Sequence, residues 1–277
     1  MGWDALRAER YQRMVSMELI DGAWPLTPRD PRVSPWKLAA YSQWEKRRMA
    51  VYAAQVERMD RGVGSILSAI KEMGIEQNTL ILFLSDNGGN YEELPVGIRG
   101  LFIPNETRDG RLVRAGNNPT VLPGSDDTYE SYGIPWANVS NTPFKLYKHF
   151  AHEGGISTPL IAYWPGIIQK GGLTNQVGHV MDVMPTCLEV AGVPYPMTHA
   201  NRQIAPLEGR SLLPVFRGQQ RDAETPIYWE HEGNRAIRQG RWKEVAVTSG
   251  SFFSTSNSWR RISCCSRRSS NSKGDFR

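Results

Sequence analysis

Apolar residues recur along the chain with a helical period before residue 75 and in short continuous runs after it. Between residues 52 and 73 they are spaced three and four apart, which places them on one face of a long helix that ends at Gly74. The members of this apolar stripe are Tyr52, Val56, Met59, Val63, Ile66, Ile70 and Met73. We expect the stripe to pack in the core and the helix to cover a sheet.

The run at residues 79–85 is seven mostly apolar residues long and predicts a strand buried on both faces of an α/β sheet. Thr158–Trp164 predicts a second buried strand, and a short helix is expected between them at Phe144–Phe150. Val177–Ala191 predicts a strand followed by a helix, with Pro185 in an early turn and Gly192 at its C-terminus. The pattern therefore indicates an α/β fold.

Beyond Pro226 the pattern changes to short alternating runs, which predict a small antiparallel hairpin sheet. Its expected strands are Ile227–Glu230, Arg235–Arg238 and Arg241–Val247. From Ser249 onward the chain is rich in serine and arginine without periodicity, and we expect this tail to be disordered. The abrupt change favours a shifted reading frame or a truncation. We expect domain boundaries of 1–220, 221–248 and 249–277.

The net charge of +5 lies entirely in the tail, so residues 1–248 are neutral overall. A basic tail could bind RNA, but the neutral body argues against a nucleic-acid-binding protein. The apolar runs are too short to span a bilayer, and the start of the chain lacks the pattern of a signal peptide. The neutral body and the short apolar runs together lead us to expect neither a nucleic-acid nor a membrane partner.

The three cysteines have no spacing that predicts a disulfide framework.

The run at residues 79–85 ends in Asp86-Asn87-Gly88-Gly89, at the edge where α/β sheets bind ligands. Carboxylate and amide oxygens are hard ligands suited to Ca²⁺ or Mg²⁺, and the glycines permit a sharp turn. A simple tight turn is the alternative explanation for this motif.

Several motifs together resemble the sulfatase family, specifically bacterial arylsulfatases of the alkaline-phosphatase-like superfamily. They are Met59-Asp60-Arg61, Leu80–Gly89, Ser131-Tyr132-Gly133, Asn141–Gly155, Asp182–Thr186 and Asn234–Arg238. The resemblance spans roughly residues 1–243 and corresponds to the C-terminal part of such an enzyme. It implies an incomplete alkaline-phosphatase-like sheet flanked by helices, followed by the start of a small antiparallel subdomain.

The resemblance also implies roles for individual residues. Asp86 and Asn87 match the family's ligands for a divalent cation, usually Ca²⁺ and alternatively Mg²⁺. Lys148, five residues before Glu153, matches the lysine that contacts the sulfate, and an ammonium there neutralises charge on the transferred group. His152 follows one turn later and is a second candidate catalytic residue. The implied substrate is a sulfate ester, either a small molecule or a sulfated glycan.

The chain departs from the family at the nucleophile. Family members use a formylglycine made from the first residue of a Cys/Ser-x-Pro-x-Arg motif, and this chain has no such motif. The family's N-terminal Asp-Asp pair, which supplies the other carboxylates of the cation site, is also absent; in the family it precedes the region that this chain matches. We therefore expect the chain alone to be inactive. The alternatives are a fragment that at most binds a cation or anion weakly, and a relative that hydrolyses phosphonate or phosphate esters.

Overall fold

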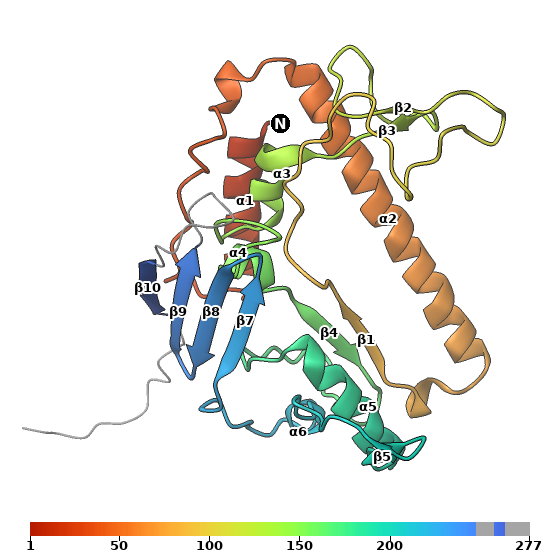
Figure 1. Cartoon of the computed structure of the whole chain (residues 1–277), viewed down its shortest axis with the longest axis vertical. Helices are drawn as coiled ribbons and strands as arrows, with labels where there is room; N and C mark the ends of the chain where they lie inside the picture. The colour runs from red at the N-terminus through yellow and green to blue at the C-terminus, as the bar shows by residue number, and fades with distance from the viewer. Residues whose placement is uncertain (248–257, 264–277) are drawn as a thin grey trace, which may run out of the picture.

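The computed structural model describes residues 1–247 and, for the backbone only, residues 258–263. Six α-helices and ten strands are found in these residues (Figure 1). The helices are α1 Trp3–Ser16, α2 Ser42–Glu72, α3 Gly133–Ser140, α4 Glu153–Ile156, α5 Val183–Ala191 and α6 Leu213–Phe216. The strands are β1 Ile81–Leu84, β2 Arg114–Ala115, β3 Thr128–Tyr129, β4 Leu160–Tyr163, β5 Thr198–His199, β6 Arg202–Gln203, β7 Ile227–His231, β8 Asn234–Gln239, β9 Trp242–Val247 and β10 Ser258–Ser263. None of the described helices is both long and apolar enough to cross a membrane.

The best-packed apolar core lies between α1 and α3. The rings of Trp3 and Trp36 meet edge to face with centroids 4.6 Å apart, and the ring of Trp136 lies 5.6 Å from that of Trp3. Val33 and Val139 complete this cluster of buried residues. Large aromatic side chains bury much apolar surface, so this cluster anchors the N-terminal part of the chain.

The predicted strands around residues 81 and 160 form, but they are not buried. β1 and β4 pair antiparallel, with Ile81 opposite Tyr163 and Leu84 opposite Leu160, and they form a sheet of two strands. Their side chains are half-buried or exposed. The prediction of buried strands is therefore wrong within the described residues, because no described layer covers both faces of this ribbon.

Helix α2 also forms as predicted and ends next to Gly74, whose φ of 69° suits a helix C-terminus. Its apolar stripe is not in the core. Ile66 is 62% exposed and Met73 is 70% exposed, and Val56 and Met59 are exposed as well. In Figure 1 the C-terminal half of α2 extends away from the other layers. The expectation that this helix covers the sheet is wrong for the described residues.

Residues 144–150 are a loop rather than the predicted helix. Leu146 and His149 have φ values of 66° and 78°, in the left-handed region that ends a right-handed helix. The Asn141 side chain donates from Nδ2 to the Leu146 carbonyl, which replaces a helical partner for that oxygen. Tyr147 is fully buried and donates its hydroxyl proton to Asp30. The apolar residues of this segment therefore fill a core position without helical geometry.

Helix α5 confirms the predicted helix, and Gly192 follows it with a φ of 65°. The strand predicted at its N-terminal side is absent, because residues 177–179 pair with no described strand. Instead His179 and Asp182 form a reciprocal capping box, and the buried Asp182 carboxylate accepts a hydrogen bond from the Arg221 guanidinium at 2.9 Å. This aspartate therefore anchors the start of α5.

The predicted hairpin sheet is confirmed. Strands β7, β8 and β9 are antiparallel neighbours, and β10 adds at the β9 edge. β7 and β8 are joined by Glu232 and Gly233, with φ values of 52° and 78°, as a two-residue hairpin turn with both φ positive requires. Strand β10 lies within the tail that was predicted to be disordered. That prediction did not include a strand there. The rest of residues 248–277 lies outside the described residues.

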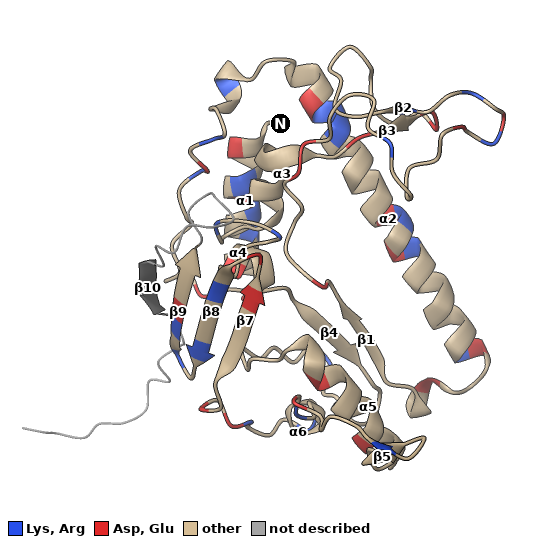
Figure 2. Ribbon diagram, in the orientation of Figure 1, with Lys and Arg blue, Asp and Glu red and all other residues tan. Residues whose placement is uncertain are grey.

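Charged side chains of both signs are interspersed over the helices and strands of the described chain (Figure 2). This distribution agrees with the neutral balance expected for residues 1–248. The RNA-binding alternative rested on the basic tail and gains no support from the described surface. The domain boundaries at 220 and 248 stay predictions.

Candidate functional site

Asp86 and Asn87 lie in the turn that leaves β1. The Asp86 carboxylate is exposed and accepts a hydrogen bond from the Asn87 backbone N–H at 3.0 Å. The Asn87 side chain donates from Nδ2 to the Gly88 carbonyl at 2.8 Å, which leaves its Oδ1 as the atom suited to a cation. The turn is therefore held by local side-chain hydrogen bonds and presents two hard oxygen donors beyond the strand end.

This turn is hydrogen-bonded to the segment that carries Lys148. Gly88 donates its N–H to the Gly155 carbonyl at 2.8 Å, and Lys148 donates its N–H to the Gly89 carbonyl at 3.2 Å. Asn141 accepts from the Gly89 N–H at 2.8 Å. The structure thus brings the turn that follows Asp86 and Asn87 beside the loop that carries Lys148, although about sixty residues separate them in sequence.

Three glycines make this close approach possible. A Cβ added to Gly88 would lie 1.8 Å from the Gly154 carbonyl oxygen. One added to Gly154 would lie 2.2 Å from the Leu146 oxygen, and one added to Gly155 would lie 1.9 Å from the Phe150 oxygen. Backbone segments that approach this closely leave no space for any side chain. The glycines of the two motifs are therefore required by packing.

Lys148 is half-buried in the loop that replaces the predicted helix. Its ammonium lies close enough to Glu92 to lower the pKa of that carboxyl, although the larger cause is the hydrogen bond that Glu92 accepts from Asn90. Lys145, three residues earlier, is exposed. The two lysines therefore differ in exposure, and the sulfate-contacting role of Lys148 stays a prediction.

His152 precedes α4, and its backbone carbonyl accepts the N–H of Gly155 at 2.8 Å. Its side chain is only 8% exposed, and its Nδ1 has no hydrogen-bond partner among the described residues. Burial is the main cause that lowers the pKa of His152 to about 4, and the nearby Lys145 and Lys243 add to it. The imidazole is therefore neutral at pH 7, and a catalytic role for it stays a prediction.

Sequence reasoning did not identify Lys243 as part of this region. Its side chain is 1% exposed, and its Nζ donates to the Glu153 carboxylate at 2.6 Å. The ammonium also lies 5.3 Å from the centre of the Trp229 ring. This ion pair ties β9 to α4.

A second group missed by sequence reasoning consists of His149, His231 and Glu232. One potential ligand atom from each lies within 4.8 Å of the other two, a spacing that could hold a metal ion. The His231 side chain is exposed at the end of β7. The adjacent His231 and Glu232 at the hairpin turn are the sequence signal for a metal site. This signal becomes informative only when the structure shows that His149 lies beside both residues.

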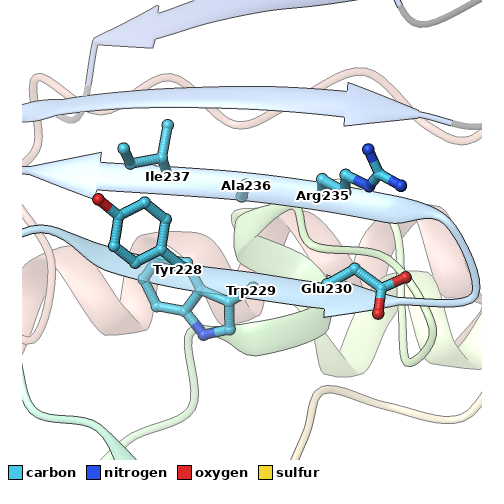
Figure 3. Close-up of a pocket in the computed structure, with 6 residues that line it drawn as sticks. All are labelled: Tyr228, Trp229, Glu230, Arg235, Ala236 and Ile237. Carbon is cyan, nitrogen blue, oxygen red and sulfur yellow. The ribbon is translucent and has the colours of Figure 1, made fainter. Parts of the chain in front are cut away.

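A hollow of about 430 Å³ lies elsewhere on the same hairpin (Figure 3). Tyr228, Trp229 and Glu230 line it from β7, and Arg235, Ala236 and Ile237 line it from β8. It contains neither the Asp86 turn nor Lys148. The candidate site is therefore defined by its side chains and backbone contacts rather than by a cavity.

Comparison with known proteins gives two overlapping family matches. The model of the sulfatase family matches residues 12–193, and a model described as N-sulphoglucosamine sulphohydrolase, C-terminal, matches residues 144–248. Between them they include both the Asp86 turn and the Lys148 loop. The first match alone covers more than half of the chain.

Similar proteins include an uncharacterized sulfatase of Schizosaccharomyces pombe, 30% identical over 89% of this chain and 44% of that protein. An arylsulfatase of Klebsiella aerogenes is 29% identical over 82% of this chain and 47% of that protein. The crystal structure of Ps i-CgsB in complex with k-i-k-neocarrahexaose has a TM-score of 0.50 at 22% identity, and it covers 94% of this chain and 48% of that one. The chain thus spans about half the length of these relatives. On these matches, the chain belongs to the sulfatase family.

Proposed function

We propose that this chain supplies the cation and sulfate contacts of a metal-assisted sulfate ester hydrolase of the arylsulfatase type. The observation that carries the proposal is the hydrogen-bonded junction between the Asp86 turn and the Lys148 loop. In such a reaction the substrate anion lies between a cation and an ammonium, so the two must be held at a constant separation. The backbone bonds of this junction and its three glycines supply that constraint.

The donor set at the turn fits a hard divalent cation in kind. The Asp86 carboxylate and the Asn87 amide oxygen are the oxygen ligands that Ca²⁺ prefers, and Mg²⁺ takes the same atoms. Ca²⁺ coordinates six to eight oxygens, whereas these two side chains offer two or three. When bound, the cation would withdraw charge from a sulfate oxygen. We therefore propose that both residues are part of a cation shell that further ligands complete.

Lys148 is the residue that we propose to contact the sulfate group. Its backbone N–H donates to the carbonyl of Gly89, which is two residues after Asn87. The backbone from which the Lys148 side chain extends therefore lies beside the end of the Asp86 turn. His152 is neutral at pH 7 and buried, so in this proposal it acts as a hydrogen-bonding group rather than as a cation. The substrate class is a sulfate ester, either a small aryl ester or a sulfated glycan.

The chain contains no Cys/Ser-x-Pro-x-Arg motif, so the nucleophile is the component that it lacks. Without a nucleophile, positioned charge stabilises little of the transition state. We therefore propose that these residues support sulfate ester hydrolysis only together with a segment that carries this motif and the family's N-terminal Asp-Asp pair.

Reconstitution tests this proposal. The chain is mixed with a separately expressed sulfatase N-terminal half whose nucleophile has been converted to formylglycine, and sulfate release from an aryl sulfate is measured with added Ca²⁺. We expect activity that neither polypeptide shows alone and that Lys148→Ala lowers about 100-fold. Lys145→Ala is the matched control and should retain it. A stable complex that releases no sulfate would contradict the proposal.

The nearest alternative is hydrolysis of phosphonate or phosphate esters, because these tetrahedral anions suit the same cation and lysine. Rates on phenyl sulfate and phenyl phosphonate in the reconstituted complex separate the two reactions. The other alternative is a binding fragment without catalysis. Calorimetric titration of the isolated chain with Ca²⁺ and with sulfate tests it, and flat titrations with both would exclude even this activity.

A further inference from the structure

We propose that His149, His231 and Glu232 form a second metal site, suited to Zn²⁺ and separate from the oxygen donors of Asp86 and Asn87. His149 lies in the loop after Lys148, whereas His231 ends β7 and Glu232 is in the hairpin turn. The site joins segments that are 82 residues apart in sequence. This inference goes beyond the proposed hydrolase function and does not depend on it.

The distances between the three side chains are those of ligands around one ion. His149 Nδ1 lies 3.2 Å from His231 Nε2 and 3.0 Å from Glu232 Oε2. His231 Nε2 lies 3.6 Å from Glu232 Oε1. Zinc bonds of about 2.0–2.2 Å place neighbouring ligand atoms about 3.0–3.5 Å apart in octahedral or tetrahedral geometry. The two ring nitrogens and the two carboxylate oxygens of Glu232 therefore already have nearly the required spacing.

The chemistry of this donor set favours Zn²⁺ over Ca²⁺. Two imidazoles and one carboxylate are a ligand set found at zinc sites that keep an open position, whereas Ca²⁺ takes oxygen ligands. His231 and Glu232 are exposed and His149 is half-buried, so an ion can enter from solvent. A fourth position is left for water or for an anionic oxygen of a ligand.

The surroundings orient His149 for this role. Glu92 Oε1 lies 3.5 Å from His149 Nε2, the ring nitrogen that the proposed ion does not use. A carboxylate beside the second nitrogen is the usual partner of a metal-binding histidine. The Asn234 side chain donates to the His149 backbone carbonyl at 3.0 Å and ties the loop to β8. His149 is thus held by contacts that do not depend on the metal.

The hairpin turn fixes the other two ligands relative to each other. Glu232 has a φ of 52°, which the two-residue turn requires, and the ring of His231 stacks on that of His149 with centroids 5.3 Å apart. A bound ion would connect the Lys148 loop to the C-terminal sheet. We expect it to act as a brace that holds this loop in place.

Zinc titration of the full-length chain tests the proposal. Cys187 is an exposed free thiol, and Cys264 and Cys265 are adjacent in the tail, so all three are first replaced by serine to remove competing thiolates. Calorimetry at pH 7.5 should then show one Zn²⁺ bound per chain. Zinc at 100 times its dissociation constant should raise Tm by roughly 5 °C.

Variants in this cysteine-free chain decide between the site and adventitious binding. His231→Ala and His149→Ala should each weaken zinc binding at least 10-fold, and Glu92→Gln should weaken it about 10-fold. His199→Ala is the matched control, because His199 is an exposed histidine on β5, and binding should not change. His231 is exposed, so its loss should leave the circular dichroism spectrum and the zinc-free Tm unchanged.

The proposal is overturned if the cysteine-free chain binds no zinc, or if His231→Ala and His199→Ala bind it equally. Neither result bears on the hydrolase proposal, because that activity is measured with Ca²⁺ and depends on Asp86, Asn87 and Lys148. Conversely, an inactive reconstituted complex leaves the zinc titration interpretable.

Discussion

The junction between the Asp86 turn and the Lys148 loop differs from helix α2 in how its residues are packed. At the junction, backbone segments approach so closely that a single added Cβ would overlap a carbonyl oxygen, and Tyr147 is fully buried. Along the C-terminal half of α2, large apolar side chains are exposed, and a Cβ added to Gly62 or Gly64 would meet no atom of another segment within 4 Å. The junction is held by many contacts between distant segments, whereas the C-terminal half of α2 is held mainly by the hydrogen bonds within the helix.

This contrast teaches that an apolar stripe predicts a buried face only when a partner surface is present. The stripe of α2 has helical spacing, and the helix forms, but no described layer covers its C-terminal half. The Asp86 turn needs no such partner, because Gly88, Gly89 and Lys148 bond directly to nearby backbone. The residues of the candidate site are therefore held by contacts within the described chain.

The largest expected effect compares the free energy of unfolding lost when an apolar side chain is removed from a buried core and from the exposed stripe of α2. Trp136→Ala removes a ring that is buried between α1 and α3, and we expect it to lower the free energy of unfolding by about 3–5 kcal/mol. Ile66→Ala on the exposed stripe should cost less than about 0.5 kcal/mol. Urea unfolding followed by circular dichroism measures both. Equal costs would show that the stripe of α2 is buried in solution.

The second comparison uses ion pairs. Lys243→Met leaves the partly buried Glu153 carboxylate unpaired and should destabilise the chain by about 3 kcal/mol. Arg61→Met breaks the exposed pair with Glu57 on α2 and should cost at most about 0.5 kcal/mol. Adding Glu153→Leu to Lys243→Met should recover part of the loss, because it removes the unpaired charge. No recovery would mean that Lys243 acts mainly through its other contacts.

The third comparison uses glycines. Gly88→Ala places a Cβ against the Gly154 carbonyl and should cost about 2–3 kcal/mol, because two backbone segments have to separate. Gly62→Ala on α2 meets no atom within 4 Å and should stabilise the chain by about 0.5–1 kcal/mol, since alanine favours helix. Thermal unfolding of the two variants gives the sign directly. A neutral Gly88→Ala would show that the junction is looser than its contacts indicate.

The smallest expected effect is the pH dependence due to His152. Its pKa is lowered from 6.5 to about 4 in the folded chain, so the unfolded chain binds more protons between these values. His152 therefore stabilises the fold fully above pH 6.5, and this contribution of roughly 2 kcal/mol is lost as the pH falls toward 4.

Comparison of the native chain with His152→Gln between pH 7 and pH 4.5 isolates this contribution. Glu130 acts with the opposite sign, because burial raises its pKa to about 7 and its contribution is lost as the pH rises. Since Glu130 is present in both proteins, its effect cancels in the difference. Identical pH profiles would show that His152 is not desolvated.

Local sequence patterns determined the family, the helices α2 and α5, the hairpin strands and the position of Asp86 and Asn87 at a strand end. These follow from periodicity, turn residues and motif spacing, which depend on residues near one another in the chain. Even so, the pattern at residues 144–150 predicted a helix that does not form. There the burial of Tyr147 and the close approach of Gly154 and Gly155 outweigh helical spacing.

Only the tertiary structure decided which distant residues meet. The contacts of Lys148 with Gly89, of Lys243 with Glu153 and of His149 with His231 join segments whose separation in sequence carries no signal of proximity. Burial likewise depends on the surrounding layers, so the same apolar spacing is exposed on α2. The sequence thus determined the elements and the family, and long-range packing decided the candidate site.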